Sequence, residues 1–544
     1  MKLKKLVALG LSTGLAVSSL AACGQKSEPA ATKGESVSTE AAKAETSGKE
    51  EAKAEAGGKF TYWVEMNGNA ATVVKDYGEI EYFKQLQDIT GVQIEFMHPP
   101  AGQAKEQFKL LIASRKDLPD VIAADWLTMY PGGPEKAVKD GIIIDLNDYI
   151  DQLPNYKAFL ESNPDYAKQA VTDEGTLFGF HGINVDTEHP SDAGLIVRQD
   201  WLDDLGLKVP ETIDEWENVL RKFKEEKGAT APFTVLLSNF LTHNGFNSAY
   251  GVGNDFYLDD DGNIQYGPIQ PAYKDYLTIL NKWYKEGLID PDFASIDNKT
   301  ISSNMINGKS GVTWAYIGSG MGTWTNAATE EGYKLAGCAN PVLNKGDEGT
   351  FTGRYKHKVM ITAAVTTNAK NLDGILKQFD YLYTEEGKML KNFGIEGVHY
   401  NMVDGKPVYT DLILKNPDGL SVSEAMAKYI QCSYPAAGMV NLPEYQEQYY
   451  ALPEQKEASV NFNTFAENAK KHVLPPITAN SDESKELANI MSQIEIYRDE
   501  SIVAFITGAT SLDEFDNFVK EINNMGIEKA IEIKKAGLAR YNAR

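Results

Sequence analysis

Two short stretches near residue 60 and residue 94 have the pattern of β-strands, and a helical pattern lies between them. Residues 60–64 and 92–96 are rich in aromatic and β-branched side chains, which predicts two strands. Residues 77–90 carry an apolar residue at every third position, which predicts an amphipathic helix. A second helix over 103–115 and a short apolar strand over 120–124 follow. This order predicts a parallel α/β sheet with right-handed crossovers.

The later part of the chain mixes a hairpin, helices and one more buried strand. Residues 256–258 and 264–266 flank an Asp-rich turn, which predicts a hairpin. Residues 273–284 have a helical apolar stripe, and residues 373–393 read as a helix that is interrupted near its middle. The apolar run 359–365 predicts a buried strand that can return to the sheet of the first three strands. The C-terminal region is mostly helical in pattern.

The first 22 residues have the pattern of a secretory signal. A basic stretch is followed by residues 6–20, which carry no charge and are too short for a transmembrane helix. The segment Leu20-Ala21-Ala22-Cys23 resembles a bacterial lipobox, so we expect cleavage before Cys23 and lipid attachment to its sulfur. An ordinary signal peptide with a chance cysteine is the alternative. Two or more acyl chains would hold the protein firmly at a membrane.

Residues 24–58 have the composition of a tether. They are mainly Gly, Ser, Thr, Ala, Glu and Lys, with one proline and no aromatic residue. Such a segment cannot bury enough apolar surface to offset the entropy lost on ordering. We therefore expect a disordered tether over 23–58 and a folded part that starts near Lys59.

Composition narrows the classes of partner. The chain has 544 residues with 53 basic and 77 acidic side chains, so its formal net charge is −24. This charge disfavours a nucleic-acid partner, because phosphate binding requires clustered Lys and Arg. Three cysteines exclude a disulfide scaffold and a four-cysteine zinc site.

Known catalytic and metal-binding motifs do not match the chain. A phosphate-binding loop ending at Lys309-Ser310 would require glycine at position 303, which is serine. A dinucleotide fingerprint at 318–323 fails because position 323 is threonine. A calcium loop around Gly262 would put Tyr257 and Pro268 at ligand positions, and neither supplies a side-chain carboxylate. We therefore expect no catalytic residue, no cofactor and no bound metal.

Four longer strings resemble one family over roughly residues 59–541. The first is 198–212, which begins Arg-Gln-Asp-Trp-Leu-Asp-Asp-Leu-Gly-Leu, and the second is 283–293, Trp-Tyr-Lys-Glu-Gly-Leu-Ile-Asp-Pro-Asp-Phe. The others are 383–400, which contains Gly-Ile-Glu-Gly-Val-His-Tyr, and 515–541, which contains Met-Gly-Ile. In this order they resemble the extracellular solute-binding lipoproteins of ABC importers, in particular the large lipoprotein type that serves carbohydrate uptake.

The resemblance implies a periplasmic-binding-protein-like α/β fold with two discontinuous lobes and a ligand cleft between them. We expect residues 59–178 and 357–425 to form the first lobe, and residues 179–356 and 426–544 to form the second. The implied protein is a monomeric, non-catalytic receptor on the extracytoplasmic face of the cell membrane. We expect it to capture a carbohydrate, in particular an oligosaccharide, and to deliver it to a membrane permease.

Aromatic side chains are candidates for stacking on a sugar. Trp63 and Trp126 follow predicted strands, and ligands of open α/β sheets lie beyond the carboxyl ends of the strands. Trp314 and Trp324 flank a Gly/Ser-rich loop, which permits close approach of the backbone. For each of these tryptophans the alternative is packing in the core.

Polar candidates would satisfy the hydroxyl groups of a sugar. They are Asn67, Asp125, Arg198, Arg354, Glu396 and His399. If the ligand is a uronate, Arg198 or Arg354 would suit its carboxylate. For Arg198 a structural salt bridge is the alternative.

Two other functions stay open at this level. A secreted glycoside hydrolase needs two carboxylates at a fixed separation, which a sequence cannot measure. A peptide-binding receptor of the same architecture would have fewer stacking aromatics and more contacts along strand edges. Cys338 and Cys432 have no motif around them and are either buried free thiols or a disulfide pair.

Overall fold

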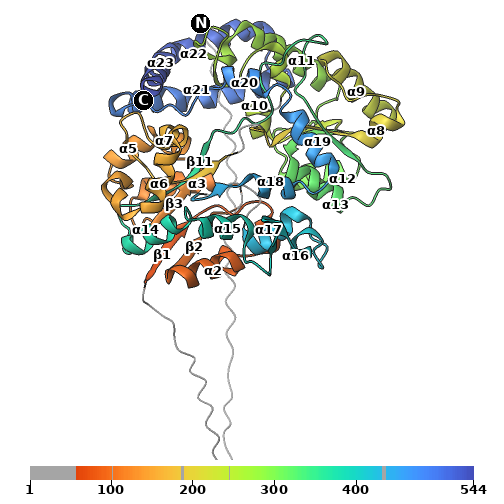
Figure 1. Ribbon diagram of the computed structural model, residues 1–544. Helices are drawn as coiled ribbons and strands as arrows, with labels where there is room; N and C mark the ends of the chain where they lie inside the picture. The colour runs from red at the N-terminus through yellow and green to blue at the C-terminus, as the bar shows by residue number, and fades with distance from the viewer. Residues whose placement is uncertain (1–56, 101, 186–188, 244, 432–436) are drawn as a thin grey trace, which may run out of the picture. The chain divides into compact units, whose positions relative to one another are not determined.

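Two β-sheets organise the chain in the computed structural model, which describes residues 57–100, 102–185, 189–243, 245–431 and 437–544 (Figure 1). The larger sheet has six strands in the order β14-β4-β11-β3-β1-β2. Its strands are β1 (Lys59–Trp63), β2 (Gln93–Met97), β3 (Val121–Ala124), β4 (Phe180–Asn184), β11 (Val359–Val365) and β14 (Val440–Asn441). We call this sheet and the helices packed on it the first lobe.

The first three strands are parallel, as the sequence predicts. β1 pairs in parallel with both β2 and β3, and the connections are α2 (Glu81–Thr90) and α3 (Ala104–Ser114). The late strand β11 does return to this sheet, which confirms the prediction. It lies between β3 and β4 and is antiparallel to both.

The second sheet has four strands in the order β10-β5-β9-β6. They are β5 (Ala193–Arg198), β6 (Phe233–Thr234), β9 (Val312–Tyr316) and β10 (Leu335–Cys338). Helices α9 (Ile213–Glu226) and α11 (Pro271–Lys285) contribute the fully buried Trp216 and Trp283 to its core. α19 (Pro453–Phe462) packs on the sheet where Gly337 leaves room, since a Cβ there would lie 2.4 Å from the Cβ of Ala458. We call this sheet and its helices the second lobe.

The chain passes between the two sheets more than once, so both lobes are discontinuous in sequence. It crosses between β4 and β5, returns between β10 and β11, and crosses again after β14 to reach α19. A β-bridge between Ser191 and Tyr355 joins the first two crossing segments. β4 and β14 belong to the larger sheet, although the predicted ranges put both in the second lobe; the lobe boundaries themselves stay a prediction.

Three C-terminal helices form a layer that reaches both lobes. They are α21 (Ser481–Thr507), α22 (Phe515–Asn524) and α23 (Ile527–Ala543). Ile494, Ile502 and Phe505 bury α21 in the core of the second lobe. α21 contacts α5 (Gly133–Lys139) of the first lobe, and its beginning lies close to the start of α5, since a Cβ at Gly132 would lie 3.0 Å from the Cβ of Ser484.

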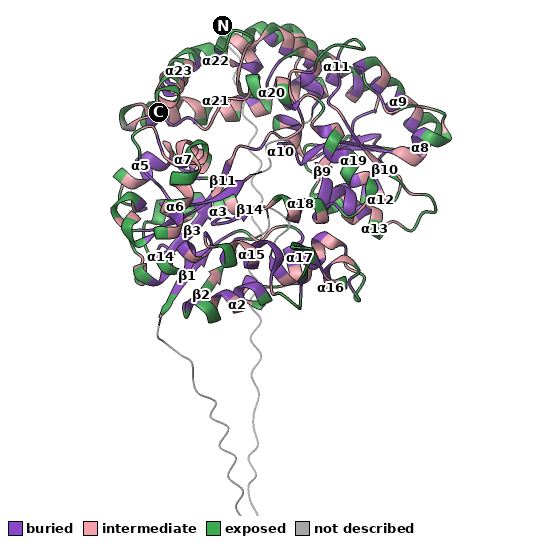
Figure 2. Ribbon diagram, viewed as in Figure 1, coloured by how far each residue is buried: buried purple, intermediate pink, exposed green. Residues whose placement is uncertain are grey.

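The predicted hairpin and the interrupted helix are confirmed. β7 (Phe256–Leu258) pairs with β8 (Ile264–Tyr266), and the helix divides into α14 (Leu372–Tyr381) and α15 (Glu385–Phe393). Thr384 causes the division because its side chain accepts a hydrogen bond from the backbone of Gly387 and so caps α15. In Figure 2 most strands of the two sheets are buried, whereas many helices have exposed outer faces; the edge strand β2 alternates between exposed and partly buried residues.

The remaining helices and strands complete the lobes. The helices are α1 (Ala70–Val73), α4 (Trp126–Met129), α6 (Pro154–Ser162), α7 (Pro164–Ala170), α8 (Gln199–Asp204), α10 (Leu237–Thr242), α12 (Asn298–Ile306), α13 (Thr323–Ala327), α16 (Asp411–Leu414), α17 (Val422–Ile430), α18 (Pro443–Tyr449) and α20 (Ala466–His472). The strands β12 (Tyr400–Val403) and β13 (Lys406–Tyr409) form a hairpin. Within the described ranges, no helix combines the length and apolar character needed to cross a membrane.

Candidate ligand-binding site

Charged and aromatic side chains meet where the chain enters and leaves the second sheet. Asp192 directly precedes β5, Tyr316 ends β9, and Arg354 and Lys356 lie on the segment that returns to the first lobe. Nζ of Lys356 lies 3.6 Å from one carboxylate oxygen of Asp192, and a guanidinium nitrogen of Arg354 lies 3.9 Å from the other. With His243 these residues form what we call the Asp192 cluster.

Asp192 supplies a buried acceptor. Its relative exposure is 7%, and its Oδ1 accepts no hydrogen bond from any residue that the structure describes. The two cations beside it balance its charge, which permits an ionised carboxylate at a buried position. Oδ1 is therefore a buried acceptor that has an ion-pair partner, Arg354, but no hydrogen-bond donor among the described residues.

The aromatic part of the cluster lies beside this carboxylate. Tyr316 is half-buried, with the guanidinium of Arg354 5.6 Å from its ring centre and the ring of Trp314 5.7 Å away at 71°. The His243 ring stacks on Trp314 at 5.4 Å. Burial, reinforced by the positive charge of Arg354, lowers the pKa of His243 to about 4. The imidazole is therefore neutral at neutral pH.

The crossing segment also approaches the first lobe. Asp125 follows β3 and caps α4 by accepting hydrogen bonds from the backbone and the hydroxyl of Thr128. Burial lowers the pKa of His357, and the negative charge of Asp125 partly opposes that change. His357 lies one residue beyond Lys356, so the end of β3 lies within electrostatic reach of the segment that carries the Asp192 cluster.

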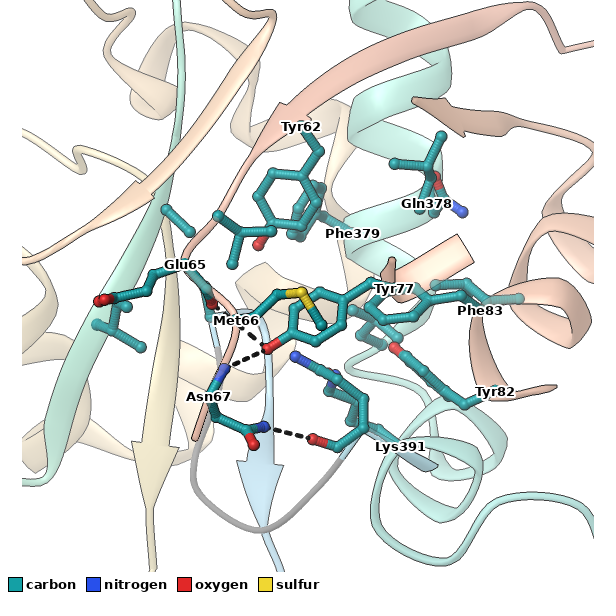
Figure 3. A pocket seen from close by; sticks show the side chains of 18 of the residues that line it. Tyr62, Glu65, Met66, Asn67, Tyr77, Tyr82, Phe83, Gln378, Phe379 and Lys391 are labelled. Atoms are coloured by element: carbon teal, nitrogen blue, oxygen red, sulfur yellow. Dashed lines mark hydrogen bonds between the residues drawn. The ribbon is translucent and has the colours of Figure 1, made fainter. Parts of the chain in front are cut away.

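A separate pocket lies at the end of β1 in the first lobe (Figure 3). Its volume is about 240 Å³, and its walls are mainly aromatic and aliphatic side chains from the sheet, α2 and α14. Asn67 lies at this pocket, where its backbone N–H donates to the hydroxyl of Tyr77 and its side chain donates to the carbonyl of Gln431.

The sequence-predicted residues divide among these places. Arg354 belongs to the Asp192 cluster and Trp314 contacts it, Asp125 lies within electrostatic reach of His357, and Asn67 lines the pocket. Trp63 and Trp126 instead both pack on Phe108 in a buried cluster, at 6.2 Å and 5.2 Å between ring centres. Trp126 also donates its indole N–H to the carbonyl of Ile122.

The contacts of Arg198 are those of a structural salt bridge, the alternative to a role in ligand binding. Its side chain is 0% exposed and forms ion pairs with Asp200 and Glu330 at 2.6 Å and 2.7 Å. Its guanidinium lies between the rings of Trp201 and Tyr333. These contacts hold α8 against the second sheet.

The last three candidates lie elsewhere. Trp324 is buried and donates its indole N–H to the hydroxyl of Ser302. Glu396 is exposed, whereas His399 is buried and bonds to the backbone N–H of Ile395 and to Glu81. The structure brings none of these three to the Asp192 cluster.

Neither a cysteine nor a cluster of metal-ligating side chains forms a further candidate site among the described residues. Cys338 is a buried free thiol, and burial raises its pKa. Cys23 and Cys432 lie outside the described residues, so their predicted states are not visible here. Across the described ranges, no group of three or more His, Cys, Asp and Glu side chains could hold a metal ion.

The chain crosses several times between two sheets that are covered by helices, and a polar and aromatic cluster lies at the crossing. This arrangement is typical of a solute-binding protein with the periplasmic-binding-protein-like fold. Residues 70–389 match the family described as bacterial extracellular solute-binding protein, and the chain belongs to this family. The predicted fold class and family are thereby confirmed.

Individual relatives and solved structures extend this result. The chain is 26% identical to lipoprotein LipO of Bacillus subtilis over 360 residues, 64% of this chain and 68% of LipO. It is 23% identical over 505 residues to the fructooligosaccharide ABC transporter substrate-binding protein FusA of Streptococcus pneumoniae, covering 88% of this chain and 90% of FusA. The crystal structure of the alginate-binding protein AlgQ2 superposes with a TM-score of 0.74 and 24% identity, over 90% of this chain and 99% of AlgQ2.

Proposed function

We propose that this solute-binding protein captures an oligosaccharide and delivers it to the membrane permease of an ABC importer. The observation that carries the proposal is the Asp192 cluster, in which a buried carboxylate oxygen without a hydrogen-bond donor among the described residues lies beside a half-buried tyrosine ring. The names of FusA and AlgQ2, which state a fructooligosaccharide and alginate, support a carbohydrate ligand.

The chemistry of the cluster suits a sugar. A sugar hydroxyl can donate to Oδ1 of Asp192, and Arg354 offers N–H donors to ring and hydroxyl oxygens. The face of Tyr316 offers an apolar surface to the C–H groups of a pyranose or furanose ring. A peptide ligand would instead rely on strand-edge hydrogen bonds.

A ligand panel tests the class of ligand. Thermal unfolding of the full chain is measured with neutral oligosaccharides, uronate oligosaccharides and peptides of similar size, because a ligand that binds only the folded state raises the Tm. We expect a concentration-dependent rise with at least one oligosaccharide and none with the peptides. A rise with peptides alone would refute the carbohydrate assignment.

Product analysis separates a receptor from an enzyme. The oligosaccharide that raises the Tm is incubated with stoichiometric protein and then analysed by mass spectrometry. We expect it to be recovered unchanged. Its cleavage would favour a secreted glycoside hydrolase instead.

We also propose that Cys23 carries the lipid anchor and that the folded part acts as a monomer on the extracytoplasmic face of the membrane. The family and the relative LipO, which is named a lipoprotein, support this location. The variant Cys23→Ala should appear in the medium, whereas Cys338→Ala, which changes a buried thiol, should stay with the membrane fraction. Membrane retention of Cys23→Ala would contradict lipidation at that residue.

A further inference from the structure

The pocket at the end of β1 is enclosed mainly by apolar side chains. Tyr62 projects into it from β1, Phe83 and Leu86 line it from α2, and Phe379 lines it from α14. Such walls offer few partners to the many hydroxyl groups of a sugar. The pocket is therefore suited to a ligand of another chemical class.

Gln378 of α14 is a buried polar side chain in these walls. It is 2% exposed and lines the pocket, and neither its Nε2 nor its Oε1 has a hydrogen-bond partner among the described residues. A buried carboxamide with both atoms unpaired is unfavourable, since most buried polar groups have at least one partner. Nε2 is a donor group and Oε1 an acceptor, and both lie in the plane of the carboxamide.

Two other polar groups at the pocket, the hydroxyl of Tyr77 and the amine of Lys391, have partners. The hydroxyl of Tyr77 bonds to Asn67 and Glu65, and Lys391 bonds to Gln431 while its Nζ lies 4.3 Å from the ring centre of Tyr82. An isolated water usually needs two to four polar partners, so Gln378 alone is a poor water site. A partner for the carboxamide is more readily supplied by a ligand.

The size of the cavity limits that ligand. An apolar cavity of roughly 150 Å³ can bind benzene, so about 240 Å³ accommodates one substituted ring. A planar amide on the ring can donate to Oε1 and accept from Nε2 of Gln378 at the same time. The aromatic walls would pack against the ring.

We propose that this pocket is a second ligand site, distinct from the Asp192 cluster, for a small uncharged aromatic molecule that carries a planar amide. The ring occupies the space between β1, α2 and α14, and the amide pairs with Gln378. This site is independent of the oligosaccharide that the protein is proposed to transport.

The test uses the full chain and two fluorinated probes of equal ring size, 4-fluorobenzamide and 4-fluorotoluene. Binding is measured by fluorine NMR titration. We expect saturable binding of the amide at least about tenfold tighter than that of the toluene, since two hydrogen bonds distinguish the probes. Absence of saturable binding of the amide, or equal affinity for both probes, would overturn the proposal.

Two variants and one control locate the site. Gln378→Leu should abolish the preference for the amide, and Leu86→Phe, which fills the cavity, should weaken both probes about tenfold or more. Gln152→Leu changes an exposed glutamine and should leave both affinities unchanged. Circular dichroism checks that each variant folds. A Gln378→Leu variant that keeps the amide preference would place the binding elsewhere and refute the assignment.

The same samples are titrated with the oligosaccharide panel. We expect Gln378→Leu and Leu86→Phe to bind oligosaccharide like the unmodified chain. If the proposed second site is wrong, the unmodified chain shows no preference for the amide probe. If the proposed transport function is wrong, only the oligosaccharide titration shows it.

Discussion

Asp173 and Arg540 form an ion pair across 367 residues of sequence, with 2.8 Å between Oδ2 and Nε. Asp173 lies between α7 and β4 in the first lobe, and Arg540 lies on α23 of the C-terminal layer. The second oxygen of Asp173 pairs with Arg544 at 2.7 Å, and the Asp173 side chain is only 1% exposed. Arg540 also pairs with Glu483 at the beginning of α21. Asp173 therefore connects the end of α23 to the first lobe, and Arg540 links the beginning of α21 to the same contact.

Replacement of this carboxylate should destabilise the protein. Asp173→Asn keeps the shape of the side chain but removes the charge that balances two arginines. Removal of one partner from a buried ion pair costs about 3–5 kcal/mol, and the partial exposure of both arginines reduces this to about 2 kcal/mol. The free energy of unfolding in urea measures the effect.

An exposed pair provides the matched control. Lys59 and Glu95 pair at 3.1 Å across β1 and β2, and their side chains are 73% and 59% exposed. Glu95→Gln should change the free energy of unfolding by less than about 0.5 kcal/mol. If Asp173→Asn behaved like this control, the contact would contribute no stability.

A second prediction concerns acid stability and rests on His181. Its ring is fully buried, donates from Nε2 to the carbonyl of Ala170 and accepts at Nδ1 from the hydroxyl of Thr362. Burial lowers the pKa of His181 from 6.5 to about 4. In the unfolded chain His181 therefore binds a proton below about pH 6.5, whereas in the folded chain it binds that proton only below about pH 4. Its contribution to stability is complete above pH 6.5 and is lost as the pH falls toward 4.

The pH dependence of unfolding tests this assignment. Between pH 7 and pH 5 the free energy of unfolding should fall by about 2 kcal/mol through His181 alone, and this part should be missing in His181→Gln. Thr362→Val removes one hydrogen bond but keeps the imidazole, so it should lower stability by about 1 kcal/mol and keep the dependence. An unchanged dependence in His181→Gln would assign it to other groups.

Local sequence patterns predict the first three strands and the late strand β11 because each is a continuous apolar or alternating run. They do not place β4 and β14, since β14 has only two residues and both strands join the sheet through distant partners.

The positions of single side chains are limited in the same way. Tyr62 and Trp63 are neighbours on β1, so they point to opposite faces. Tyr62 lines the pocket and Trp63 packs on Phe108, which the sequence cannot distinguish.

In the candidate site too, the sequence identifies single residues but not the partners that fold beside them. Trp314 and Arg354 could be singled out from the sequence as an aromatic residue and a cation. Asp192 could not, because its neighbours form no motif and its significance comes from Arg354 and Lys356, more than 160 residues further along the chain.

A third prediction concerns Gly353, where the backbone passes very close to β5. A Cβ at this position would lie 1.9 Å from the carbonyl oxygen of Ala193, which accepts a hydrogen bond from the backbone N–H of Arg354. Gly353→Ala must move this segment and with it the guanidinium beside Asp192. We expect weaker oligosaccharide binding, measured by calorimetry. Gly346→Ala is the control for an added methyl group, since nothing lies within 4 Å of a Cβ there, although its positive φ of 92° adds some strain.

The last prediction separates the polar from the aromatic part of the Asp192 cluster. Asp192→Asn keeps an acceptor but loses the charge, so the strong hydrogen bond from a sugar hydroxyl should weaken and the affinity should fall about tenfold or more. Tyr316→Phe keeps the ring face and should bind nearly as well as the unmodified chain, whereas Tyr316→Ala should lose about tenfold or more. Calorimetric titration with the oligosaccharide that raises the Tm measures all three. Equal affinities for Tyr316→Phe and Tyr316→Ala would show that the ring does not contact the ligand.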